Sequence, residues 1–284
     1  MLVRMRKSFR SALAAALAAC VLAPPSFAED PRKGGKWDGP ISSTWSGFYV
    51  GIYAGRAWGD ADLRTDVGTV TATSYFNSAA NISSINQNGS GPISPDAAVG
   101  GAQIGFNVQQ GKLVAGLEAD FGSFNLTGSR GAANFPYPTF PAGQYTVRTS
   151  MDTDWLFTAR ARVGWTPQSN LLIYATGGLA ITNLHVSNSF SDNAPEQGVG
   201  GSSNSQVKAG WTLGGGAEWA LSRNWSLKTE YLYVNFGSVS TSGSITCGPG
   251  GVAICNFFGV TPSPFSTSAD LSAHIARLGL NYKF

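Results

Sequence analysis

Charged side chains stand at alternate positions in segments that otherwise consist largely of glycine, alanine and larger apolar residues. Glu118 and Asp120 form one such pair, and Arg160 and Arg162 form another. A spacing of two places both members of a pair on the same face of a β-strand. Opposite charges on neighbouring antiparallel strands can then pair across the sheet. Further charged residues occupy the same kind of position later in the chain: Lys208, Glu218, Lys228, Glu230 and Arg277.

The chain offers little else for catalysis or metal binding. Its two histidines, His185 and His274, stand near the expected ends of strands, where either could approach Asp192 or Asp270. A single histidine at such a place is usually part of a polar surface, and the spacing of the two forms no metal or haem motif. We therefore predict no catalytic residues, no metal site and no cofactor.

A period of two predicts the strands that carry the charged residues. Residues 155–165 read Trp-Leu-Phe-Thr-Ala-Arg-Ala-Arg-Val-Gly-Trp, with the apolar side chains on one parity. Such alternation is typical of a strand with one apolar face. Each segment is close to the 9–11 residues that a tilted strand needs to cross a bilayer. The eight expected strands are residues 48–58, 101–109, 113–121, 155–165, 171–182, 208–219, 225–234 and 275–284.

The connections between these segments are alternately short and long. The short ones are residues 110–112, 166–170 and 220–224, and the long ones are 59–100, 122–154, 183–207 and 235–273. Outer-membrane barrels have short periplasmic turns and longer extracellular loops. The sequence therefore predicts an all-β fold, an eight-stranded antiparallel up-and-down transmembrane β-barrel. Both termini should lie on the periplasmic side, and the four long extracellular loops should be disordered or semi-ordered.

The first 28 residues have the features of a secretory signal peptide. Basic residues precede an apolar run at residues 12–22, and Ser26-Phe27-Ala28 suits cleavage after Ala28. The apolar run is too short to cross a bilayer as a helix. Lipidation of Cys20, which follows Leu17-Ala18-Ala19, is the alternative, but the apolar run continues past it. We predict a cleaved signal peptide at 1–28, a flexible periplasmic leader at 29–44 and the barrel at 45–284.

Removal of the signal peptide changes both the charge and the cysteine count. The chain has 19 Lys and Arg against 16 Asp and Glu, and four of the basic residues lie before residue 11. The mature net charge of −1 gives no reason to expect a nucleic-acid partner. Cys247 and Cys255 remain, and in an oxidising compartment we expect them to form a disulfide. Two free thiols are the alternative.

The tryptophans indicate which face of the barrel meets lipid. Indole favours the membrane interface, so two aromatic girdles would place tryptophan at strand ends. A soluble barrel would instead direct its apolar parity inward. The glycine-rich polar parity fits a crowded barrel interior, and we therefore predict that the apolar parity faces lipid. The expected interface residues are Trp45, Trp58, Trp155, Trp165, Trp211, Trp219 and Trp225.

Several segments resemble one known family. They include Trp45-Ser46-Gly47-Phe48-Tyr49-Val50-Gly51, residues 210–219 and the C-terminal residues 277–284. These resemble the small outer-membrane immunogenic, or porin-like, proteins of alphaproteobacteria, which share the architecture of the OmpA transmembrane domain. The resemblance covers about residues 45–284, although the long loops match nothing recognisable. It implies a surface antigen, an envelope-stabilising protein, a small pore or a haemin binder.

The last strand also resembles the C-terminal signal that barrel-insertion machinery recognises. Leu280, Tyr282 and Phe284 share one parity, and Phe284 ends the chain. The other expected partners are outer-membrane lipid, lipopolysaccharide and host or environmental surface ligands, and the expected state is a monomer. Unpaired charge in a narrow barrel interior is costly, so we expect the charged residues to pair and fill it. The prediction is a non-enzymatic outer-membrane structural protein exposed at the surface, and the alternative is a narrow passive pore.

Overall fold

The computed structural model describes residues 44–68 and 71–284. The predicted signal peptide, Cys20 and nearly all of the predicted leader lie outside the described residues. The described elements are β1 (Gly47–Val67), α2 (Ala79–Gly89), β2 (Gly91–Ile93), β3 (Asp96–Gln110), β4 (Leu113–Phe124), β5 (Thr127–Pro136), β6 (Gln144–Gln168), β7 (Leu171–Asp192), β8 (Gly198–Ala220), β9 (Trp225–Cys247), α3 (Val252–Phe258) and β10 (Ser263–Lys283). Neither α2 nor α3 is long and apolar enough to cross a membrane.

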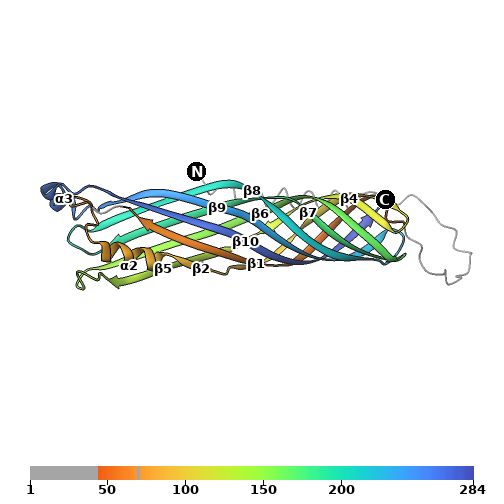
Figure 1. Ribbon diagram of the computed structural model, residues 1–284, viewed down its shortest axis with the longest axis horizontal. Coiled ribbons are helices and arrows are strands. Elements are labelled where there is room, and N and C mark those ends of the chain that lie inside the picture. The colour runs from red at the N-terminus through yellow and green to blue at the C-terminus, as the bar shows by residue number, and fades with distance from the viewer. Residues whose placement is uncertain (1–43, 69–70) are drawn as a thin grey trace, which may run out of the picture. The chain divides into compact units, whose positions relative to one another are not determined.

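Eight of these strands form a closed antiparallel ring. The order is β1-β3-β4-β6-β7-β8-β9-β10, and β10 pairs back to β1 from Lys283 opposite Tyr49 to Phe265 opposite Val67. Near the short-turn end, closure therefore gives each of the eight strands two hydrogen-bonded neighbours. The short strands β2 and β5 lie off this ring and pair with β1 and β6. The predicted eight-stranded antiparallel barrel is confirmed, and Figure 1 shows its long strands side by side.

The short turns lie where the alternation predicts them. Gly111 and Lys112 join β3 to β4, and Gly111 has the positive φ of 60° that a two-residue hairpin favours. Two residues also join β6 to β7, and residues 221–224 join β8 to β9. The backbone N–H of Phe284 donates to the carbonyl of Phe48 over 3.0 Å, which holds the C-terminus at this same end. We call it the short-turn end.

The prediction of disordered or semi-ordered long loops is wrong, because most of these residues extend the strands. Residues 144–154, expected in a loop, belong to β6, and residues 235–247 belong to β9. The long strands therefore continue well beyond the 9–11 residues that cross a bilayer. Only the ends of these segments form helices or irregular connections, with α2 between β1 and β2 and α3 between β9 and β10.

The polarity of the two faces inverts along β10. Near the short-turn end, Leu278 points outward and is exposed, while Arg277 points inward and is buried. Further along, Leu271 and Phe265 occupy the inward parity and are buried, while Ser268 occupies the outward one. A lipid-facing wall must be apolar outside, whereas a water-facing wall must be apolar inside. The strand thus changes its solvent partway along its length.

The interior of the barrel is consequently layered. We call the half of the barrel away from the short-turn end the outer half. Its inward residues form an aliphatic cluster that includes Leu156, Leu184, Leu232 and Leu271. Beyond it lies an aromatic cluster at the end away from the short turns, defined by these buried residues: Val67, Phe76, Ile85, Tyr137, Tyr145, Val147, Phe190, Ile245 and Phe265. Helix α2 contributes Ile85 to this aromatic cluster and so packs over the barrel end.

Candidate functional site

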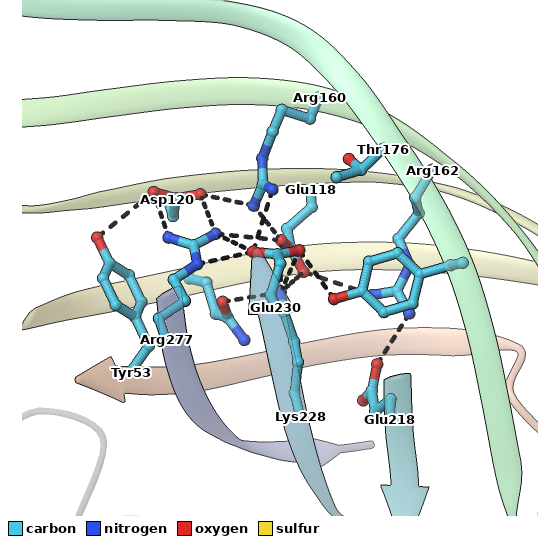
Figure 2. Close-up of polar contacts among 12 residues, drawn as sticks. Tyr53, Glu118, Asp120, Arg160, Arg162, Thr176, Glu218, Lys228, Glu230 and Arg277 are labelled. Atoms are coloured by element: carbon cyan, nitrogen blue, oxygen red, sulfur yellow. Dashed lines mark hydrogen bonds and ion pairs between the residues drawn. The ribbon is translucent and has the colours of Figure 1, made fainter. Parts of the chain in front are cut away.

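Eight charged residues meet inside the half of the barrel that has an apolar outer surface. We call them the charged layer: Glu118 and Asp120 on β4, Arg160 and Arg162 on β6, Glu218 on β8, Lys228 and Glu230 on β9, and Arg277 on β10. Four are acids and four are bases, so the formal charge of the layer balances. All eight side chains are buried, because each lies on the inward parity of its strand. Figure 2 shows them converging on one another.

Two of the pairs join neighbouring strands, as the sequence predicts. Glu118 stands directly opposite Arg160 in the β4–β6 register, and the two side chains form an ion pair. Glu230 stands opposite Arg277 in the β9–β10 register, and Arg277 Nη2 lies 2.5 Å from Glu230 Oε2. Cross-strand partners have the closest side-chain positions in a sheet, so register alone brings these groups together.

Asp120 joins residues of two separate strands. Its Oδ2 lies 2.8 Å from Arg160 Nη2 and 3.0 Å from Arg277 Nη2. The hydroxyl of Thr158 also donates to Oδ2 over 2.6 Å. Arg160 in turn reaches Glu230 over 3.1 Å, so each guanidinium contacts more than one acid. Such shared contacts link the pairs into one network.

Lys228 reaches across the barrel to the opposite wall. Its Nζ lies 2.7 Å from Glu118 Oε1, and it also donates to Gln103 Oε1 over 3.1 Å. β9 and β4 stand four places apart in the ring of eight, so they are on opposite sides of it. The long side chains of Lys228 and Glu118 together cover this distance. The lysine–glutamate contact therefore spans the barrel interior.

Glu218 does not pair with the residue that faces it in the sheet. Lys228 is its register partner on β9, but Glu218 Oε2 lies 2.8 Å from Arg162 Nη2 on β6. Ser226 and Asn281 donate to its other oxygen over 2.6 Å and 2.8 Å. Since Lys228 turns to Glu118, Arg162 supplies the charge that Glu218 needs. Figure 2 shows this pair beside the main group.

Three tyrosines complete the network, and the sequence analysis missed them. Tyr49 donates to Glu118 over 2.6 Å, and Tyr174 donates to Glu230 over 2.8 Å. The Arg277 guanidinium carbon lies 4.3 Å from the centre of the Tyr53 ring, a cation–π distance. Tyr49 and Tyr53 alternate with glycines on the inward parity, so parity was the signal that could have found them.

Inward-facing glycines leave room for this network. A Cβ on Gly55 would meet the backbone of Ala276 and lie 2.8 Å from the Cβ of Arg277. Such close approach requires a residue without a side chain. The Arg277 side chain can therefore cross in front of β1 to reach Asp120 on β4.

The prediction that Lys208 belongs to the charged layer is wrong. Glu230 lies opposite Gly216 on β8, and Lys208 lies eight residues further from the short-turn end. At about 3.3 Å per residue, this separation is roughly 26 Å along the strand. Lys208 also lies where the β8–β9 ladder is interrupted, between Gly200 and Trp211. Lys208 has the same inward parity as the charged layer, but it lies further along the barrel axis from the short-turn end.

The prediction that Trp45 is a membrane-interface residue is also wrong. Its side chain is only 5% exposed and packs inside the short-turn end with Val114, Leu172, Tyr174 and Ala220. Trp45 shares the inward parity of Tyr49, which explains its direction. Trp58, Trp165, Trp211, Trp219 and Trp225 are exposed on the outside, and Trp155 is half-buried against Phe121.

The remaining predicted residues lie outside the charged layer. His274 Nδ1 lies 2.5 Å from the Tyr231 hydroxyl and its Nε2 lies 3.8 Å from Asp60, on the outer wall. Asp192 accepts hydrogen bonds from Tyr75 and Tyr137 at the outer end. Cys247 and Cys255 are joined by a disulfide. On the outside of the short-turn end, Leu280 is half-buried, and the rings of Tyr282 and Phe284 lie 5.3 Å apart.

A closed antiparallel barrel with an apolar outer belt, aromatic rims and a buried charged interior is the architecture of an outer-membrane β-barrel. The apolar parity faces outward, since Leu117 is 67% exposed while its neighbour Glu118 is buried. The chain belongs to the outer membrane protein beta-barrel domain family, whose model matches residues 11–284. The protein is therefore located in the outer membrane.

Related proteins have outer-membrane names. The chain is 32% identical over 242 residues to the 31 kDa outer-membrane immunogenic protein of Brucella melitensis, covering 85% of this chain and 84% of that one. It is 25% identical over 195 residues to the 25 kDa outer-membrane immunogenic protein of Brucella abortus, covering 69% and 67%. The crystal structure of OprG from Pseudomonas aeruginosa superimposes with a TM-score of 0.41 and 14% identity, covering 86% of this chain and 99% of that one.

Proposed function

We propose that this protein is a structural component of the outer membrane. The interior of its barrel is plugged, and the barrel end opposite the short-turn end is exposed at the cell surface. The observation that carries the proposal is the contact between Lys228 and Glu118, because it joins opposite walls of the barrel. The protein would act through its surface and its stability in the membrane, and it would catalyse no reaction.

Energetics support a plug over an open channel. Removing one partner of a buried ion pair costs about 3–5 kcal/mol, so an ion that separates these pairs meets a high barrier. The aliphatic cluster lies directly beyond the charged layer, where Ile275 follows Arg277 on the inward parity of β10. Apolar constrictions oppose conduction by excluding water. A permeating ion would have to pass both layers.

The proposed orientation places the short turns in the periplasm and the outer half of the barrel outside the cell. The signal peptide would direct export, and the C-terminal Leu280, Tyr282 and Phe284 would present the insertion signal. The apolar belt would contact membrane lipid and lipopolysaccharide. Since β10 pairs with β1 and closes the ring within one chain, a monomer suffices for a stable fold.

A narrow passive pore is the second candidate, and the shared contacts of the charged layer favour it. Arg160 contacts Glu118, Asp120 and Glu230, so it could exchange partners without becoming unpaired. A coordinated exchange could open a transient path for small ions. This mechanism requires the aliphatic cluster to open as well.

Single-channel conductance in planar bilayers tests the two candidates. For the plugged barrel we expect no stable openings from the wild-type protein. Stable openings that are lost or enlarged in an Arg160→Ala variant would establish the pore and reject the plug. The Lys208→Ala variant is the matched control, because Lys208 lies outside the charged layer. Heat-modifiable gel mobility would verify that each variant is folded.

A further inference from the structure

The connection between β9 and β10 exposes two adjacent phenylalanine rings at its tip. Phe257 is 84% exposed and Phe258 is 67% exposed, and their ring centres lie 5.0 Å apart. Val252, on the same short helix α3, is also exposed. We call Val252, Phe257 and Phe258 the α3 tip. Figure 1 shows α3 at the end of the barrel opposite the C-terminus.

Several covalent and backbone contacts hold the α3 tip in place. The disulfide between Cys247 and Cys255 ties the helix to the end of β9. The helix ends at Gly259, whose left-handed φ of 61° lets its N–H bond to the Cys255 carbonyl. At its start, Gly251 packs so closely against the Glu196 backbone that a Cβ would clash. The rings are thus presented on a braced helix, which lowers the entropy cost of binding.

The hairpin that carries the α3 tip has no charged side chain of its own over a long stretch. No Asp, Glu, Lys, Arg or His occurs from Tyr231 to Ala269, which includes the outer half of β9, α3 and most of the outer half of β10. From the neighbouring connection, the backbone of Glu196 lies against the base of the helix, at Gly251. Moving charged groups out of water is costly, so this hairpin can enter an apolar phase without that penalty.

The exposed area suits a lipid surface better than a protein partner. A phenylalanine buries roughly 200 Å² when it is covered, so the α3 tip offers about 350 Å². A stable protein interface needs about 800 Å² from each partner, usually with polar contacts at its rim. The tip lacks both the area and the charged rim. Phenylalanine on the apolar face of an interfacial helix is buried at the headgroup–acyl boundary of a bilayer, which demands no fixed shape.

We propose that the α3 tip inserts into the interface of an opposing lipid bilayer, such as that of another cell or vesicle. The inference rests on the proposed outward orientation and adds a binding activity to it. β9 runs twelve residues from Asn235, near the outer edge of the apolar belt, to Cys247. At about 3.3 Å per residue and a tilt of about 40°, this raises the tip roughly 30 Å. The tip therefore lies too far from its own membrane to insert there.

Flotation with phosphatidylcholine vesicles tests this proposal. The mature chain is embedded in lipid nanodiscs, which protect the apolar belt and leave both barrel ends accessible. We expect wild-type nanodiscs to float with the vesicles and empty nanodiscs not to. The double variant Phe257→Ser and Phe258→Ser should lower the partition coefficient by about a hundredfold, roughly tenfold for each ring. The matched control is Phe140→Ser, which removes another outer aromatic ring that is 46% exposed and should change partition less than about twofold.

The proposal is rejected if nanodiscs that contain the wild-type protein float no better than empty nanodiscs. It is also rejected if the double variant floats as well as wild type. An equal loss with Phe140→Ser would indicate general stickiness and also reject it. Pairing of nanodiscs without vesicles would assign the tip to a second copy of the chain.

A separate measurement distinguishes failure of the proposed orientation. An epitope inserted after Pro249, in the connection between β9 and α3, should be accessible to antibody on intact cells. Because nanodiscs expose both ends, flotation does not depend on orientation. An inaccessible epitope with normal flotation would therefore reject the orientation, and with it contact with another cell, while the lipid affinity would stand.

Discussion

Lys228 Nζ lies 2.7 Å from Glu118 Oε1, although β9 and β4 stand on opposite sides of the ring. The register partner of Lys228 is Glu218, and pairing between adjacent strands would have joined those two. Instead, Lys228 spans the interior and Arg162 takes Glu218. The barrel interior therefore behaves as one connected polar core. Its stability should depend on residues that no single pair of strands contains.

Loss of the spanning contact should destabilise the barrel. We expect Lys228→Met to lower the free energy of unfolding by about 3 kcal/mol, because it leaves a buried acid with less compensation. Urea unfolding in lipid vesicles, followed by heat-modifiable mobility, measures this. Lys208→Met is the matched control and should cost less than about 0.5 kcal/mol. Equal costs for the two variants would contradict the spanning role.

A double-mutant cycle gives the coupling of the same pair. Glu118→Gln alone should also destabilise, since Arg160 and Lys228 both contact Glu118. Together with Lys228→Met, the loss should be smaller than the sum of the two by about 1–3 kcal/mol. Additive losses would show that the two side chains do not interact in the membrane.

Trp45 and Trp219 should differ in their contribution to stability. Trp45 fills the short-turn end, so Trp45→Ala should cost about 3–5 kcal/mol through the cavity it leaves. Trp219 lies on the outside, where lipid can replace the ring, and Trp219→Ala should cost clearly less. Urea unfolding of the two variants in vesicles compares them. A larger loss of stability for Trp219→Ala than for Trp45→Ala would contradict the role of Trp45 in packing the barrel interior.

The outer end should loosen at alkaline pH. Burial and the nearby Asp192 carboxylate raise the pKa values of Tyr75 and Tyr137 well above their usual range. Both hydroxyls donate to Asp192, over 2.8 Å and 2.6 Å. Unfolded tyrosine ionises near pH 10, while the folded groups stay protonated. Their stabilisation is therefore fully present below about pH 10 and decreases as the pH rises above it.

Limited proteolysis of the outer end at pH 9 and pH 11 measures this effect. Residues 137–143 and 193–197 should become more sensitive at the higher pH. In the double variant Tyr75→Phe and Tyr137→Phe, most of this pH dependence should disappear. A pH response that is unchanged in the double variant would assign the effect to other groups.

The disulfide should stabilise α3 without affecting the barrel. It closes a loop of eight positions at the outer tip, where a crosslink of this size contributes about 2–3 kcal/mol locally. Replacing Cys247 and Cys255 by serine should expose residues 248–262 to protease. The unfolding midpoint of the membrane-embedded barrel should remain the same. A large shift in that midpoint would show that α3 belongs to the cooperative unit of the barrel.

Local patterns along the chain are enough to predict the class of fold and the apolar belt. A period of two along residues 155–165, with turns of few residues between segments, predicts the membrane-crossing part of each strand and its direction near the short-turn end. These are local properties, since each strand's parity and each turn's length depend on adjacent residues. The buried acids and bases of β4 and β6 were predicted for the same reason. Parity places them on one inward face, and the structure supplies the register that sets Glu118 opposite Arg160.

The position of each inward residue along the barrel axis, and its contacts across the barrel, depend on how all eight strands are arranged. Lys208 and Lys228 share the same alternation, but one is above the charged layer and the other spans it. The strands of the outer half were not predicted, because the apolar residues change from the outward to the inward face. On β10, Leu278 faces outward near the short-turn end, whereas Leu271 packs inward further along. Apolar and polar residues alternate in the same way whether the apolar face points inward or outward. Which face is apolar depends on the surrounding solvent, and the closed ring with its layered interior shows where that solvent changes.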